Sequence, residues 1–274
     1  MTLTMPYILF LILNLLVFET VAFSEPQQDQ EKRGKAVVSL SDEDLRSTET
    51  ASEKIKKDGN QNITPTILIV GGGGSHDFDR WFNLEDSKIL TEAGANVRYT
   101  DQPKNILAVL DELDILYLSN NQPLPDPELR QSIFDFVESG NDLLLVHAAI
   151  WYNWNDWAAY NQKLVGGGSR SHGPYGEFKV QVVDPNHPVM ESVPATFTIK
   201  DELYRFEKDR EGSDIHVLAK GIEPDTGEEY PVAWTVDYGK GQIVCITLGH
   251  DGESHHHEAY RTILKNSIKW LSDN

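Results

Sequence analysis

The sequence predicts an α/β domain whose sheet is mostly parallel, with helices on both faces and an added antiparallel hairpin. First, short and fully apolar runs such as 67–70 and 143–146 are typical of strands that are buried on both faces. Second, segments with helical signals alternate with these runs, which favours parallel pairing with right-handed crossovers. Third, the turn at 239–241 joins the apolar stretches 232–236 and 242–248, and this pattern predicts a hairpin.

The first half of the domain alternates strands and helices. Gly94 ends the first helix, and Asp126 caps the third helix, which has Pro127 in its first turn and ends at Gly140. The predicted strands are 67–70, 96–99, 115–118 and 143–146, and the predicted helices are 84–93, 105–110 and the one that begins at Asp126.

In the second half of the domain, strands and helices no longer alternate regularly. An aromatic-rich loop at 151–157 follows the fourth strand, and later segments such as 178–183 alternate apolar and polar residues, as strands do. The remaining predicted elements are a helix at 158–165, strands at 178–183, 195–199, 216–219, 232–236 and 242–248, and a last helix at 257–271.

Two segments precede the domain, which covers residues 64–274. In residues 1–24, the apolar run Tyr7–Phe18 is followed by small residues suited to signal peptidase, and the run is short for a membrane span. We therefore expect a signal peptide, with an uncleaved anchor as the alternative. Residues 25–63 are polar and nearly free of aromatic side chains, so we expect a disordered spacer.

The composition excludes one class of partner and points to a location. The formal net charge is −19 at pH 7, whereas a nucleic-acid-binding protein needs a basic surface, so we expect no nucleic acid. Repulsion from anionic lipids leaves membrane contact only through the signal segment. Cys245 is the only cysteine, so no intramolecular disulfide can form. We expect an exported protein, periplasmic or extracellular.

Three histidines, His76, His147 and His250, each follow the end of a predicted strand. Because parallel strands bring their carboxyl ends to the same edge of a sheet, these side chains are candidates for one cleft. Neutral imidazoles that meet there could bind a divalent metal, zinc first, or act as acid and base near neutral pH. The alternative is that each is an ordinary polar residue at a strand end, since no HExxH spacing is present.

Two acids and a phenol follow another predicted strand, as Asp201, Glu202 and Tyr204. A carboxylate at this place could orient a histidine, serve as a base or bind a sugar hydroxyl. We therefore include Asp201 and Glu202 with the three histidines as catalytic candidates. The alternative is that they are ordinary acids at a turn.

Aromatic side chains follow directly after His147. Flat faces such as those of Trp151 and Trp154 suit stacking on sugar rings beside a polar cleft, although such rings also pack against sheets. His172 lies on a predicted loop that could cover the cleft. We assign Trp151, Trp154, Tyr204 and His172 to substrate binding.

The glycine-rich loop Gly71–His76 lacks the Gly-Lys-Ser/Thr of a phosphate-binding loop, and His76 stands where a dinucleotide fingerprint has its third glycine. Asp101 could bind a ribose, which keeps a dinucleotide site open as an alternative. The simpler interpretation is that these glycines allow a close approach of the backbone to a neighbour or ligand.

The run His255–His257 opens the last helix, where we expect solvated side chains or, through nearness to His250, additional metal ligands. Cys245 lies within an apolar strand and is expected to pack as a small hydrophobic residue.

Together these stretches resemble the ThuA-like (trehalose utilisation) family of the class I glutamine amidotransferase-like superfamily. The resemblance covers residues 64–272 and implies a flavodoxin-like sheet and a role in carbohydrate metabolism, on oxidised (keto) sugars or glycosides. The matching stretches are the first strand with Gly73–Asp77, then Leu144–Ala148, Leu164–Pro174, His187–Val189, Asp201–Tyr204, Pro231–Trp234, Tyr238–Gly241 and Leu248–Asp251.

One departure from the superfamily bears on the reaction. Glutamine amidotransferases carry a nucleophilic cysteine after the strand equivalent to 143–146, and His147 stands at that place here. We therefore expect no amidotransferase activity. The leading hypothesis is a hydrolase, lyase or isomerase acting on a small sugar derivative. Two others stay open: a non-catalytic carbohydrate-binding protein, and a module that holds a partner enzyme.

Overall fold

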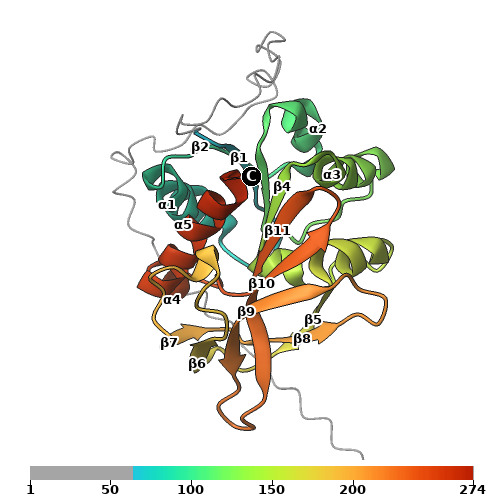
Figure 1. The fold of residues 1–274 in the computed structure, drawn as a ribbon. Coiled ribbons are helices and arrows are strands. Elements are labelled where there is room, and N and C mark those ends of the chain that lie inside the picture. The colour runs from blue at the N-terminus through green and yellow to red at the C-terminus, as the bar shows by residue number, and fades with distance from the viewer. Residues whose placement is uncertain (1–63, 274) are drawn as a thin grey trace, which may run out of the picture. The chain divides into compact units, whose positions relative to one another are not determined.

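The structure, a computed structural model, describes residues 64–273, so the predicted signal segment and spacer lie outside the described residues. One nine-stranded sheet has the order β2-β1-β3-β4-β11-β10-β9-β6-β7, and β5 and β8 form a second sheet (Figure 1). The strands are β1 Thr66–Val70, β2 Asn96–Thr100, β3 Ile115–Leu118, β4 Asp142–Val146, β5 Gly167–His172, β6 Gly176–Val182, β7 Thr196–Asp201, β8 Tyr204–Lys208, β9 Ile215–Ile222, β10 Glu229–Tyr238 and β11 Gly241–Ile246.

Strands β2, β1, β3, β4 and β11 pair in parallel. The carboxyl ends of β1, β4 and β11 therefore lie at the same edge of the sheet, which is where an open α/β sheet binds ligands. The predicted fold class is confirmed.

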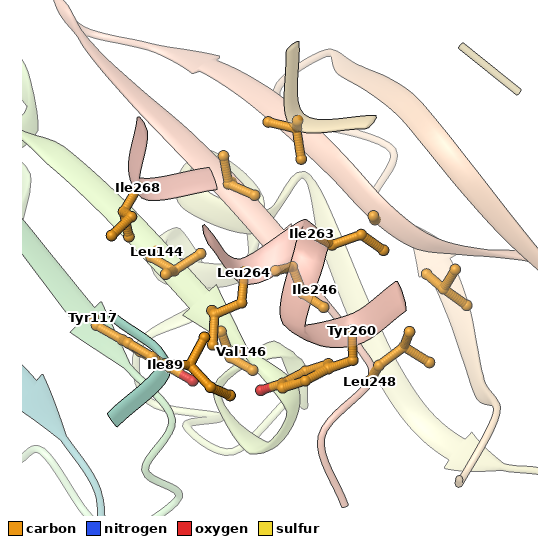
Figure 2. Packing of buried hydrophobic residues seen from close by; sticks show 14 of the residues in the cluster. Ile89, Tyr117, Leu144, Val146, Ile246, Leu248, Tyr260, Ile263, Leu264 and Ile268 are labelled. Atoms are coloured by element: carbon orange, nitrogen blue, oxygen red, sulfur yellow. The ribbon is translucent and has the colours of Figure 1, made fainter. Parts of the chain in front are cut away.

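Alternate residues of β4 face opposite layers of helices. Leu144 and Val146 pack in one buried cluster with residues of α1 (Ser87–Glu92) and α5 (Glu258–Ser272). Leu143 and Leu145 pack in a second cluster with residues of α2 (Ile106–Val109) and α3 (Pro127–Ser139). Figure 1 shows α1 and α5 on one side of the sheet and α2 and α3 on the other, and Figure 2 shows the first cluster around Leu144, Val146 and Leu264. Burial on both faces explains why these strands read as unbroken apolar runs.

The hairpin of β10 and β11 forms as predicted, and the antiparallel part extends further, through β9, β6 and β7. The two-stranded sheet of β5 and β8 was not predicted, because residues 167–172 and 204–208 show no clear apolar alternation. His172 is consequently the last residue of a strand and does not lie on a loop.

Each predicted helix forms, but the bounds differ from those predicted. The first begins early, as a π-helical segment Asp79–Asp86 that continues into α1, and not at residue 84. In α3 (Pro127–Ser139) Asp126 caps the start through the Glu128 N–H, and Gly140 ends the helix in the left-handed region. Helix α2 spans Ile106–Val109, the predicted helix at 158–165 is π-helical over Tyr160–Val165, and α4 (Gly252–His255) was not predicted.

Among residues 64–273 no helix combines the length and the apolar character that crossing a membrane requires.

Candidate metal centre

Four ligand atoms converge at the carboxyl edge of the parallel strands. His76 follows β1, His147 follows β4, His250 follows β11, and Glu202 lies in the turn between β7 and β8. Each offers one nitrogen or oxygen atom, and these atoms all lie within 4.8 Å of one another. The structure thus brings together the three histidines that the sequence places at strand ends and Glu202, which the sequence analysis names as a catalytic candidate but not as a metal ligand.

His147 is fully buried and has a fixed tautomer. Its Nδ1 donates to the carbonyl oxygen of Thr247 at 2.6 Å, so Nε2 of the neutral ring carries the lone pair. Burial holds the pKa of His147 well below its usual range, and the neighbouring His76 acts in the same direction. The backbone φ of His147 is 47°, an uncommon value for a residue with a side chain. Such backbone strain clusters at functional sites.

His76 lies between the other two rings. Its Nε2 is 3.0 Å from Nε2 of His147 and 3.2 Å from Nδ1 of His250. Burial, with the charge of His250, lowers the pKa of His76 to about 4, so the ring is neutral at physiological pH. Its Nδ1 is 2.5 Å from Oγ of Ser75, which fixes the ring orientation.

His250 and Glu202 form the more solvent-accessible side of the centre. Nδ1 of His250 is 3.2 Å from Oε2 of Glu202. Burial acts to lower the pKa of His250, but the hydrogen bond and charge of Glu202 outweigh it, so this pKa is raised. Burial likewise acts to raise the pKa of Glu202, but the hydrogen bond and charge of His250 outweigh it, and that pKa is lowered.

The spacing of these atoms fits a divalent cation. A tetrahedral zinc ion with Zn–N bonds of about 2.0–2.1 Å holds its ligand atoms about 3.3 Å apart. The two nitrogen–nitrogen distances at His76 and the His250–Glu202 contact are 3.0, 3.2 and 3.2 Å. Histidine nitrogens with one carboxylate suit zinc and related transition metals. The same contacts can also carry a proton between rings, which is the acid–base alternative.

A cavity of about 290 Å³ opens beside the centre. Apart from one alanine, its lining side chains are polar or aromatic, and none of the lining residues among those the structure describes is a lysine or an arginine. The lining residues are Ser75, His76, Asn121, Ala148, Trp151, Asn153, His172, Glu202, Tyr204 and His250. A molecule in this cavity would therefore meet three of the four converging groups.

Three of the predicted substrate-binding residues line this cavity. The hydroxyl of Tyr204 is 3.1 Å from Nε2 of His147, and burial raises the pKa of Tyr204 well above its usual range, so the phenol stays protonated and donates. Trp151 packs edge-on against Tyr204, with ring centroids 5.2 Å apart. Nε2 of His172 is 3.7 Å from Oε1 of Glu202.

Trp154 lies elsewhere. Its side chain is buried in the second core cluster, and Nε1 donates to the carbonyl oxygen of Gln122 at 2.9 Å. It is absent from the cavity lining, because its ring packs against Trp157 and Tyr160.

Asp201 is adjacent to the centre, but both of its carboxylate oxygens accept hydrogen bonds from the protein and are not among the converging ligand atoms. Its Oδ2 accepts from the N–H of Gly249 and the hydroxyl of Ser254, and its Oδ1 accepts from the N–H of Glu202. Burial raises the pKa of Asp201 to about 6, although these three hydrogen bonds act to lower it. The carboxylate thus joins the turn that carries Glu202 to the turn that carries His250.

His255 corrects the expectation of a solvated helix start. The side chain is fully buried, and Nδ1 lies 2.7 Å from Oδ1 of Asp86. Its Nε2 lies 3.1 Å from the carbonyl oxygen of Gly249, so both ring nitrogens are engaged within the chain. Sequence reasoning missed Asp86, which lies in the first helical segment among residues that otherwise read as an amphipathic surface.

The glycine-rich loop makes a close approach to its neighbours. A side chain on Gly73 would collide with the amide of Asn121, and φ at Gly73 is +132°. The amide of Gln122 donates to the carbonyl oxygen of Gly71, so the loop is bonded to the segment after β3. These contacts fit the simpler of the two interpretations of the loop.

Comparisons with known proteins agree with this architecture. The ThuA family, described as trehalose utilisation, matches residues 67–271. A ThuA-like protein from Parabacteroides merdae ATCC 43184 is 19% identical, with a TM-score of 0.67 over 77% of this chain and 91% of that chain. A ThuA-like protein from Bacteroides uniformis ATCC 8492 is 20% identical, with a TM-score of 0.65 over 78% and 95%.

A β-galactosidase from Rahnella sp. R3 shares the fold over 76% of this chain and 32% of its own, with 13% identity and a TM-score of 0.52. No match was found among curated proteins. Since the family match spans most of the described domain, the chain belongs to the ThuA (trehalose utilisation) family.

Proposed function

We propose that this protein is an exported enzyme of carbohydrate metabolism that acts on an uncharged sugar or keto-sugar derivative at a divalent metal centre. The observation that carries the proposal is the convergence of His76, His147, His250 and Glu202 within 4.8 Å beside a cavity. A site built only to stabilise the fold would be expected to be closed on all sides.

The cavity lining supports a neutral, hydroxyl-rich ligand. Trp151 and Tyr204 offer aromatic faces, and Asn121 and Asn153 offer amide groups that can bind hydroxyls. The lining residues include no lysine or arginine to bind a phosphate group. We therefore favour a free sugar derivative over a sugar phosphate. The family description, trehalose utilisation, supports a sugar as the ligand class.

Each group has a chemical role in the proposal. A divalent metal at this centre would polarise a carbonyl or hydroxyl oxygen of the substrate. Oε1 of Glu202 lies on the side of His172, where it can accept a proton from the substrate. Tyr204, which stays protonated, can donate a hydrogen bond to a substrate oxygen. Proton abstraction next to a carbonyl would serve a lyase or isomerase, and water activation would serve a hydrolase.

A non-catalytic sugar-binding protein is the second candidate, and the ring of Trp151 in the cavity lining favours it. In this case the aromatic face would supply the affinity and the metal ligands would be dispensable. A module that holds a partner enzyme is a further form of this candidate.

The test compares variants on a panel of glycosides, free sugars and their keto derivatives. The proposal predicts that His147→Ala abolishes turnover while sugar affinity persists, and that Trp151→Ala mainly weakens affinity. His216→Ala is the matched control, because His216 is an exposed histidine of β9 whose ring pairs with Asp184. Unchanged turnover of a proven substrate by His147→Ala would contradict the enzyme proposal. Export is tested separately, by the N-terminal sequence of protein recovered outside the cytoplasm.

A further inference from the structure

A second polar cluster, fully buried, lies beside the metal centre. Oδ2 of Asp86 accepts from the hydroxyls of Tyr117 at 2.6 Å and Tyr260 at 2.9 Å, and Oδ1 faces Nδ1 of His255 at 2.7 Å. All four side chains are buried. Tyr117 comes from β3 and Tyr260 from α5, and both rings belong to the cluster shown in Figure 2. Burying a charge is costly unless the charge is paired and hydrogen-bonded.

Both nitrogens of His255 face acceptors. One acceptor is the carboxylate of Asp86 and the other is the carbonyl oxygen of Gly249. A ring that donates from both nitrogens is an imidazolium. Burial acts to lower the pKa of His255, but the charge and hydrogen bond of Asp86, with the Gly249 carbonyl, outweigh it, so this pKa is raised. The ring of Trp81 stacks on His255 with centroids 5.8 Å apart, which also favours a cation.

His255 contacts Gly249, which comes immediately before the proposed metal ligand His250. Gly249 adopts a φ of +123°, and its N–H donates to Asp201 at 2.8 Å while its carbonyl oxygen accepts from His255 at 3.1 Å. We call this pair of bonds the Gly249 clamp. Gly249 is thus held at its N–H and at its carbonyl oxygen by two buried side chains. No atom of His255 is among the four ligand atoms.

We propose that His255, held by Asp86, is a positioning residue for the metal ligand His250, which it orients through the Gly249 clamp. Asp201 completes the device, because the same carboxylate also bonds the N–H of Glu202. The turns that carry His250 and Glu202 are therefore both hydrogen-bonded to the buried carboxylate of Asp201, and the two side chains contact each other. This inference rests on the proposed metal centre.

The first experiment measures metal binding by metal-free protein. Co²⁺ or Zn²⁺ is titrated against wild type and His255→Gln by chelator competition. Loss of a group that orients a ligand typically weakens metal affinity by about 10–100-fold. His256→Gln is the matched control, since His256 is the next residue and its side chain is 55% exposed. Its affinity should equal that of the wild type.

The second readout separates positioning from general stabilisation. At saturating Co²⁺, the visible absorption spectrum of His255→Gln should resemble that of His250→Ala, because both lose His250 from the metal. A residue that only stabilises the fold would lower the melting temperature and leave the spectrum as in the wild type. That result, or an unchanged Co²⁺ affinity, would overturn the proposal.

A third measurement needs no variant. In ¹⁵N spectra of wild type near neutral pH, both ring nitrogens of His255 should be protonated, with slowly exchanging protons. An unprotonated ring nitrogen would overturn the proposal even if His255→Gln failed to fold. If wild type bound neither Zn²⁺ nor Co²⁺, the metal centre itself would be wrong, whereas the state of the His255 ring would still report on the clamp.

Discussion

Nε2 of His147 lies 3.0 Å from Nε2 of His76, although 71 positions separate the two residues in the chain. The tautomer of His147 leaves a lone pair on this nitrogen, so the contact requires a proton or a metal ion between the rings. Burial lowers the pKa of both histidines, so both rings are neutral at physiological pH, as a metal ligand must be. The following predictions concern this centre and the elements that support it.

Metal affinity should fall as the pH falls through the pKa of His250. A ligand nitrogen must be unprotonated, and the pKa of His76 is about 4 and that of His147 is lowered too, whereas the pKa of His250 is raised. His250 is therefore the histidine that must lose a proton, and below its pKa the affinity should drop about tenfold per pH unit. Titration calorimetry in several buffers should count one proton released per metal ion. A pH-independent affinity would contradict this assignment.

Tyr204→Phe should not weaken metal binding. The Tyr204 hydroxyl occupies the same lone pair of His147 that a metal would use, so removing it frees the ligand. A net hydrogen bond of about 0.5–1.5 kcal/mol corresponds to at most about tenfold tighter binding. Chelator competition measures this effect, and turnover should decrease at the same time. Markedly weaker binding would instead identify the Tyr204 oxygen as a ligand.

Gly249→Ala should lower the free energy of unfolding by about 1–3 kcal/mol, because a side chain at φ +123° is strained. The new Cβ would also lie 3.3 Å from the hydroxyl of Tyr260. Chemical denaturation measures the change. Gly74→Ala is the control, since no atom lies within 4 Å of its Cβ position and its φ is not in the left-handed region. Equal stability of the two variants would refute the argument.

Asp142→Asn should stabilise the protein above about pH 6 and have less effect near pH 4. Burial raises the pKa of Asp142 to about 6 from a usual 3.8, so the folded state prefers the protonated form. This contribution is fully present below pH 3.8 and is lost as the pH rises through about 6. The shift corresponds to at most about 3 kcal/mol. Thermal melts across this range, with the exposed Asp111→Asn as control, measure it. A variant less stable than wild type at pH 8 would contradict the prediction.

Much of this centre follows from the sequence, because the ends of parallel strands lie at one edge. The prediction that His76, His147 and His250 share one cleft rests on their positions after predicted strands, and the structure brings those strand ends to one edge. Leu143–Val146 is recognisable as a central strand because burial on both faces requires an unbroken apolar run.

The remaining parts depend on side chains that meet only in the folded chain. Glu202 approaches from the turn before β8, a strand that pairs with the glycine-containing β5 and has no clear periodic pattern. Asp86 and His255 are 169 positions apart, and each alone reads as a surface residue on a helix. Their burial depends on how the segment Asp79–Asp86, α4 and α5 pack together. The periodicity of a sequence does not predict which helices pack against each other.

The most direct test of the metal centre is elemental analysis of the purified full chain. Wild type should contain about one divalent transition-metal ion per chain, and His216→Ala should retain it. His76→Ala and His147→Ala should each lose it while keeping the circular dichroism spectrum of the wild type. A wild type that stays metal-free after exposure to zinc, cobalt and manganese, or a His147→Ala variant that retains the metal, would contradict the account.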